Sequence, residues 1–200
     1  MKGPAPALSP IFRSDTQGRL LAALVAEPDR EFSLAGLAER ADTSPATSGR
    51  EIDRLEAAGI VRSRRVGNTR MVSIETTGRL YQPLAEIVTA TWGVPAIIAE
   101  EFGSLPGAQG VFIFGSWAAR WHGELGRQPN DIDVLVLGHP DRNQVDDAAE
   151  RAEKRIRLPV QATVRSAERW ADPHDPFDES IRGRPLYEVI PLHADNGERP

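Results

Sequence analysis

Apolar positions before Gly59 recur every three or four residues, which is the spacing of one face of an α-helix. A first helix is predicted over residues 17–26, and it ends at Pro28 because proline cannot continue a helix. A second helix is predicted after Ser33 and a third after Ser44, since serine caps free helix amides. The chain therefore opens with three short helices.

Beyond Gly59 the pattern changes to that of strands. The runs Ile60–Val66 and Thr69–Glu75 are separated by Gly67-Asn68, a pair that tolerates the positive backbone angles of a tight turn. A two-stranded hairpin with several arginines is therefore predicted directly after the third helix.

The third helix is expected to present a polar face. Ile52 and Leu55 point inward, which places the following residues on the opposite face: Thr47, Arg50, Glu51 and Arg54. Three helices followed by an arginine-bearing hairpin resemble the winged helix-turn-helix of ArsR-type and MarR-type transcriptional regulators, over residues 12–76.

This resemblance implies binding to double-stranded DNA. The third helix would lie in the major groove, and the hairpin arginines would contact phosphate or the minor groove. A winged helix used only for protein contacts is the alternative. The residues expected at the DNA are Ser44, Thr47, Arg50, Arg54, Arg64, Arg65 and Arg70.

Residues 77–102 are predicted to form a connecting helix. Leu80, Leu84, Ile87 and Val88 form one apolar stripe, and Gly93-Val94-Pro95 is expected to interrupt the helix. The stripe must be buried, either on its own winged helix or on the matching helix of a second subunit. We favour the second arrangement, a homodimer through residues 78–102.

A second domain is expected over residues 103–195, after a segment rich in turn formers. A buried strand ending at Phe114 leads into Gly115-Ser116, and 14 residues separate Ser116 from Asp131. The alternation Asp131-Ile132-Asp133 sends both carboxylates to one face of the next strand.

This pattern resembles the minimal single-domain members of the nucleotidyltransferase superfamily of DNA polymerase beta. The resemblance implies that Gly115 and Ser116 cradle a polyphosphate and that Asp131 and Asp133 bind Mg²⁺ as the catalytic carboxylates. A magnesium-bound nucleoside triphosphate is the expected ligand, and the sequence does not indicate its base.

The strand Pro159–Ser166 departs from the family at about Gln161, where a third acidic residue is expected. An amide oxygen can ligate magnesium but cannot act as a base, so Gln161 is assigned to ligand binding and catalysis is left open. His122 and Glu124 lie in a segment that looks inserted and is interpreted as a surface loop. The pair His174 and Asp175 is interpreted as a loop rather than a metal site.

Composition limits the remaining possibilities. The chain has no cysteine, which excludes disulfides and cysteine nucleophiles. Its net charge is -5, but residues 1–78 carry 11 basic and 10 acidic side chains, whereas residues 79–200 carry 13 and 19. No apolar run approaches the roughly 18 residues of a membrane span, so no membrane partner and a cytoplasmic location are expected.

These observations predict an α+β protein of two domains, in which a winged helix precedes an α/β domain with a small mixed sheet. The expected function is transcription regulation by DNA binding, with a magnesium-nucleotide as effector. Two alternatives remain: an active nucleotidyltransferase that moves a nucleoside monophosphate onto a protein, nucleic acid or small molecule, and an antitoxin-like member of a toxin–antitoxin pair.

Overall fold

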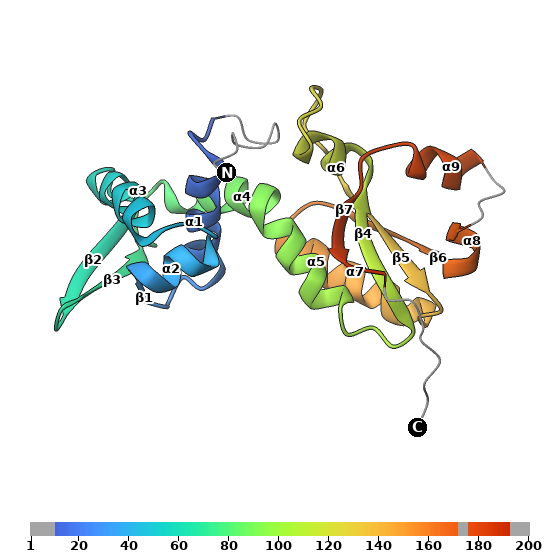
Figure 1. Ribbon diagram of the computed structural model, residues 1–200, viewed down its shortest axis with the longest axis horizontal. Coiled ribbons are helices and arrows are strands. Elements are labelled where there is room, and N and C mark those ends of the chain that lie inside the picture. The colour runs from blue at the N-terminus through green and yellow to red at the C-terminus, as the bar shows by residue number, and fades with distance from the viewer. Residues whose placement is uncertain (1–10, 172–175, 193–200) are drawn as a thin grey trace. The chain divides into compact units, whose positions relative to one another are not determined.

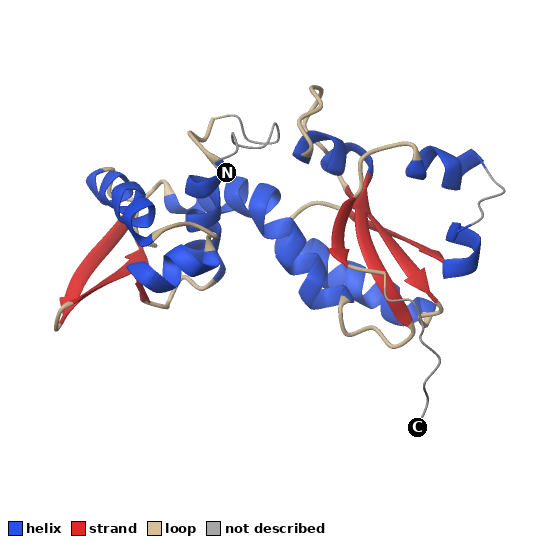
Figure 2. Ribbon diagram, viewed as in Figure 1, coloured by secondary structure: helices blue, strands red, loops and turns tan. Residues whose placement is uncertain are grey.

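The computed structural model describes residues 11–171 and 176–192. Helices and two small sheets form a mixed α+β fold (Figures 1 and 2). The chain divides into two compact units at Gly93 and Val94. His174 and Asp175, interpreted above as a loop, lie outside the described residues.

The first unit has the element order of a winged helix. Up to Ile74 its elements are α1 (Asp15–Ala26), β1 (Phe32–Ser33), α2 (Leu34–Arg40), α3 (Pro45–Ala57), β2 (Val61–Val66) and β3 (Thr69–Ile74). The strands form an antiparallel sheet in the order β1-β3-β2. The predicted three helices and hairpin are thus observed, and β1 adds a short third strand.

Serine side chains begin all three helices. The Oγ atoms of Ser14, Ser33 and Ser44 each accept a hydrogen bond from a backbone amide in the first turn of α1, α2 and α3. The predicted caps at Ser33 and Ser44 are confirmed. Apolar residues from every helix and from the sheet then form one core, including Leu20, Leu24, Leu37, Ile52 and Val72.

Helical structure continues from residue 81 to residue 102. It comprises α4 (Tyr81–Val88), the π-helical turn η1 (Thr89–Gly93) and α5 (Val94–Phe102). The predicted interruption at Gly93-Val94-Pro95 therefore comes earlier and takes the form of a π turn. Proline has no amide hydrogen and its ring clashes with the carbonyl four residues back, here that of Thr91, so a wider turn before Pro95 relieves both problems.

The second unit contains a four-stranded mixed sheet in the order β6-β5-β4-β7. Within residues 11–171 and 176–192, β5 and β6 pair in parallel, and the other neighbouring strands of this sheet are antiparallel. After α5, its elements are β4 (Ala108–Phe114), α6 (Gly115–Trp121), β5 (Ile132–Gly138), α7 (Arg142–Ile156), β6 (Val160–Arg165), α8 (Ala167–Ala171), α9 (Pro176–Arg182) and β7 (Tyr187–Ile190).

Helices cover both faces of this sheet. Helices α5 and α7 pack on each other and on one face (Figure 1). On the other face Phe114, Leu135, Leu137 and Ile181 form an apolar cluster, which α8 and α9 cover. Among the described residues, no helix is both long and apolar enough to span a bilayer.

Candidate functional site

Gly115 and Asp133 lie in contact where β4 meets α6. Gly115 has a backbone φ of 70°, in the left-handed region that favours glycine. A Cβ atom at this position would lie 2.0 Å from Oδ2 of Asp133. Only glycine therefore lets the carboxylate of Asp133 lie against this turn, and the predicted glycine–aspartate pair is brought together.

Asp131, immediately before β5, and Gln161, on β6, join this group. Gln161 is the Cα partner of Asp133 in the register of β5 and β6. The side-chain amide of Gln161 donates a hydrogen bond from Nε2 to Oδ2 of Asp131, at 3.0 Å. Four of the five predicted residues of this site, Gly115, Asp131, Asp133 and Gln161, thus lie in one chain of contacts.

Ser116, the fifth, is an exposed residue in the first turn of α6. It immediately follows Gly115, so its hydroxyl lies beside the glycine turn and is open to a ligand.

The two carboxylates differ in their surroundings. Burial, and next the negative charge of Asp131, raise the pKa of Asp133 to about 6. In the free protein Asp133 therefore takes up a proton as the pH falls through about 6. A cation bound between the carboxylates would remove the repulsion that favours this proton.

The donor set fits magnesium. Mg²⁺ prefers oxygen ligands and is commonly held in proteins by one or two carboxylates together with phosphate oxygens. Asp131 and Asp133 supply the carboxylates, and the carbonyl oxygen of Gln161 is a third possible donor. Among the described residues no group of three or more acidic or histidine side chains is placed to hold a metal, so no third carboxylate joins Asp131 and Asp133 there.

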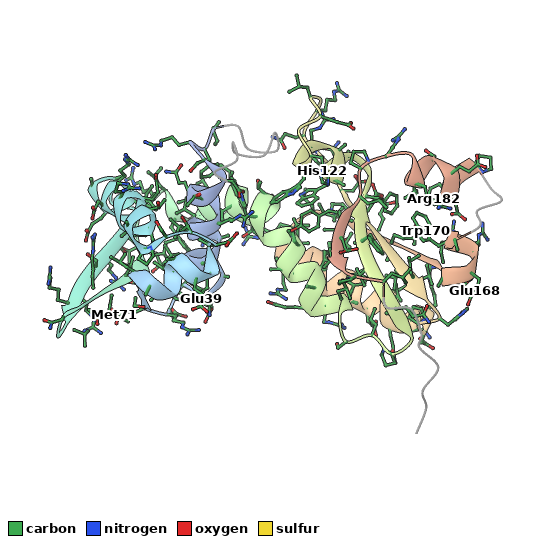
Figure 3. All side chains as sticks on the ribbon, viewed as in Figure 1. Glu39, Met71, His122, Glu168, Trp170 and Arg182 are labelled. Carbon is green, nitrogen blue, oxygen red and sulfur yellow. The ribbon has the colours of Figure 1, made fainter. Side chains whose placement is uncertain are left out.

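The segment between α6 and β5 lies at the surface, as predicted. His122, labelled in Figure 3, is exposed, and its Nε2 lies 3.1 Å from the carbonyl oxygen of Leu186. Oε2 of Glu124 lies 3.9 Å from Nη2 of Arg120. Gly126 packs on that same arginine, since a Cβ there would lie 2.1 Å from Nη1. The contacts of His122 and Glu124 thus support the loop and do not involve the aspartates.

One charged cluster was not predicted from the sequence. The carboxylate of Asp178 on α9 is fully buried, and it accepts hydrogen bonds from Nε of Arg165 at 2.7 Å and from Nε of Arg169 at 2.9 Å. Nearby, Arg182 lies over the ring of Trp170, 5.7 Å from its centroid (Figure 3). No sequence motif marks Asp178, because its partners come from a different strand and helix.

In the first unit, α3 presents fewer polar side chains than predicted. Arg50 and Arg54 are exposed, but Thr47 and Glu51 are buried, so the prediction that all four share an exposed face is wrong. The physical reason is local pairing: Thr47 accepts hydrogen bonds from Ser44 and Arg50, and Glu51 accepts one from Arg54 at 2.8 Å. Thr47 is therefore placed to orient Arg50 rather than to read a base.

The hairpin arginines also differ from one another. Arg70 turns back toward α3, where it pairs with Asp53 and Glu56. Arg64 donates from Nε to Glu31, at 2.7 Å. Arg65 is exposed, and within the described part of the chain its side chain forms no ion pair. Arg65 is the hairpin arginine whose charge is free for another molecule.

Comparisons with known proteins found similarity in solved structures alone, since no protein-family model and no curated protein matches the chain. Reduced HlyU from Vibrio cholerae N16961 shares 21% identity over 36% of this chain and 73% of its own, with a TM-score of 0.31. The MarR family transcriptional regulator SPO1453 from Silicibacter pomeroyi DSS-3 shares 23% over 43% of this chain and 62% of its own, with a TM-score of 0.32.

Lactococcus lactis ZitR, solved in complex with DNA, shares 20% identity over 45% of this chain and 60% of its own, with a TM-score of 0.33. Each match leaves more than half of this chain uncovered. Two of the three proteins are matched over less than two thirds of their own length. Because these likenesses are low, the winged-helix assignment rests on the order and pairing of the elements described above.

The apolar stripe of the connecting helix is buried only in part within the first unit. Val88 is fully buried in the core, with Tyr81 and Leu84 packed against that core. Leu80 and Ile87 stay 65% and 38% exposed. Within the stripe, the apolar surface left for a second subunit to cover is therefore that of these two residues. A homodimer stays a prediction that rests on them.

Proposed function

We propose that this protein is a DNA-binding transcriptional regulator whose second unit binds a magnesium-bound nucleotide as effector. The observation that carries the proposal is the contact between Gly115 and Asp133, because it places a carboxylate directly against the glycine turn that leads into α6. The winged-helix arrangement, with exposed arginines on α3 and the hairpin, supports the DNA part.

Each group has a role in this proposal. Asp131 and Asp133 hold the magnesium ion, which neutralises the charge of the nucleotide's phosphates. Ser116 supplies a hydroxyl donor, and Gly115 leaves space for the Asp133 carboxylate. Gln161 orients Asp131 through its hydrogen bond. On the DNA side, Arg50 and Arg54 face the major groove, whereas Arg65 contacts phosphate or the minor groove.

Binding is favoured over transfer because of Gln161. Nucleotidyl transfer needs a base or a third negative charge near the attacking group, and an amide supplies neither. The variant Gln161→Asp restores a carboxylate at this position. We expect the wild-type protein to label no target with a radioactive nucleoside triphosphate. Robust labelling by the wild type that is lost in Asp131→Ala would show that the protein is a transferase, with the nucleotide as its substrate and not its effector.

The nucleotide part is tested by titration calorimetry of the full chain with each nucleoside triphosphate and Mg²⁺. Binding that requires Mg²⁺ and disappears in Asp131→Ala supports the proposal, and absence of binding by all four triphosphates contradicts it.

The DNA part is tested by selecting duplex fragments that the protein retains and then measuring their affinity. The double variant Arg50→Ala, Arg54→Ala should lose binding, whereas Arg142→Ala, an exposed arginine of the second unit, should not. Equal retention of DNA by wild type and double variant would show that α3 does not contribute to DNA binding.

A further inference from the structure

Phe177 is a large apolar side chain on the surface near the start of α9, and it is 48% exposed. Single exposed apolar residues are ordinary, so its position matters more than its exposure. Its ring lies edge-on to that of Phe114, with 6.4 Å between the centroids and 84° between the ring planes. Phe114 is the strand residue immediately before Gly115.

Phe114 also connects this ring to the carboxylates. It is the Cα partner of Asp133 across the antiparallel pair of β4 and β5. Directly paired residues of two antiparallel strands project side by side from the same face of a sheet. Phe177 is therefore separated from Asp133 by one aromatic side chain.

A charged cluster holds Phe177 in this place. The guanidinium of Arg165 lies 5.4 Å from the centroid of the Phe177 ring. The same guanidinium bonds to the buried carboxylate of Asp178, the next residue along α9. Because Arg165 ends the strand that also carries Gln161, one strand contributes both to the carboxylate pair and to the support of the exposed ring.

We propose that Phe177 stacks on the base of the nucleotide whose phosphates and magnesium ion are held at Gly115, Asp131 and Asp133. This inference rests on the proposed function, and it names the part of the ligand that the phosphate site does not explain. Every base has a flat π face, so stacking on Phe177 accepts all four nucleotides and gives little discrimination among them. The ring is already fixed by Arg165 and Phe114, so binding a base orders little that was free before.

The test separates the base from the phosphates. Titration calorimetry of the full chain with Mg²⁺ uses two probes, ATP and inorganic tripolyphosphate, which lacks a base. We expect Phe177→Ala to weaken ATP binding about 5- to 150-fold, the range for loss of one stacking contact, and to leave tripolyphosphate binding unchanged. Phe177→Tyr, which keeps a ring, should bind ATP like the wild type.

Two further variants control for other effects. Phe177→Leu keeps an apolar contact for Phe114 without a π face, and it should also lose ATP affinity, so the test does not depend on the folding of the alanine variant. Leu125→Ala removes a side chain that is 92% exposed elsewhere in the unit and should change neither probe.

The failures are distinguishable. Unchanged ATP affinity in Phe177→Ala and Phe177→Leu, with tripolyphosphate still bound, would overturn the stacking role and leave the phosphate site in place. Absence of binding of both probes to the wild type would overturn the proposed function together with this inference.

Discussion

At the residue scale, the proposed nucleotide site depends on the close contact between Gly115 and Asp133. The glycine has a positive φ, and the carboxylate occupies the space where any other residue would carry Cβ. The position of the Asp133 carboxylate thus requires glycine at residue 115. Two glycine substitutions, one that fills this space and one that only strains the backbone, test this requirement directly.

Gly115→Ala is expected to displace the Asp133 carboxylate, because the new Cβ would lie 2.0 Å from Oδ2. The affinity for magnesium-nucleotide should fall by about tenfold or more, which corresponds to at least about 1.4 kcal/mol. Titration calorimetry of the two proteins measures this change.

Gly123→Ala is the matched control, since Gly123 also has a positive φ, of 95°, and has nothing within 4 Å of an added Cβ. It should strain the backbone and leave nucleotide affinity unchanged. If Gly115→Ala binds nucleotide as tightly as Gly123→Ala does, the glycine turn has no part in the site.

Asp133 predicts a pH dependence of stability for the metal-free protein. Because burial and Asp131 raise its pKa from 3.8 to about 6, the folded protein holds an extra proton between these values. The stabilising contribution of protonated Asp133 to the free energy of unfolding is fully present below about pH 4 and is lost as pH rises through 6. Asp133→Asn cannot lose a proton and should lack this decline.

Urea denaturation of both proteins at pH 5, 6 and 7, without magnesium, measures the difference. Parallel changes in wild type and Asp133→Asn would mean that the carboxylate of Asp133 is not desolvated. With magnesium-nucleotide present the sign reverses, because the ligand requires the ionised carboxylate, so affinity should rise through the same pH range.

At the element scale, short-range sequence patterns predict helix caps and turns but not the short strand β1 or the π turn η1. The caps at Ser33 and Ser44 and the hairpin at Gly67-Asn68 were predictable, because each follows from short-range rules. The place of Gln161 beside the aspartates was expected from the resemblance to the nucleotidyltransferases alone. The two-residue strand β1 shows no periodicity, and the π turn at Thr89–Gly93 depends on Pro95 further along the chain.

Side-chain pairing was also beyond sequence reasoning. Helical periodicity placed Glu51 on the exposed side of α3, whereas its bond with Arg54 and its contact with Arg13 hold it in a buried position. The cluster around Asp178 joins residues from β6, α8 and α9, and such long-range contacts leave no local pattern.

Gly18→Ala is expected to destabilise the first unit. A Cβ at Gly18 would lie 2.1 Å from Cε2 of Trp92, a buried ring that also donates a hydrogen bond to Asp15 at 2.8 Å. We expect overpacking to cost about 1–3 kcal/mol of unfolding free energy, although alanine favours helices.

Gly49→Ala on α3 provides the comparison, since its nearest neighbour, Cδ1 of Leu34, would lie 3.9 Å away. This variant should gain about 0.5–1 kcal/mol from helix propensity alone. Urea denaturation of the full chain measures both, and a stabilising Gly18→Ala would show that Trp92 does not pack there.

Glu31→Gln should strengthen DNA binding by releasing Arg64 from its ion pair. The freed charge adds about one phosphate contact, so the slope of log affinity against log salt should steepen by about 1. Glu39→Gln on α2 removes an equal charge from the same unit without freeing a paired arginine. Identical salt slopes for the two variants would show that Arg64 does not reach DNA.

At the scale of the whole molecule, the proposed function joins two binding activities in one chain. The first unit has a net charge near zero in the sequence count, with arginines paired to acidic neighbours on α3 and the hairpin. The second unit carries the excess of acidic residues and the carboxylate pair. For a regulator, occupancy of one site must change the affinity of the other, and this linkage is reciprocal.

The most direct test measures the affinity of the full chain for a selected DNA duplex with and without the magnesium-nucleotide it binds. Fluorescence anisotropy at fixed salt and fixed free Mg²⁺ gives both values, for the wild type and for Asp133→Ala. The account predicts a 5- to 150-fold change in the wild type, the usual range for allosteric coupling, and none in the variant. Equal DNA affinity with and without nucleotide in the wild type would contradict it.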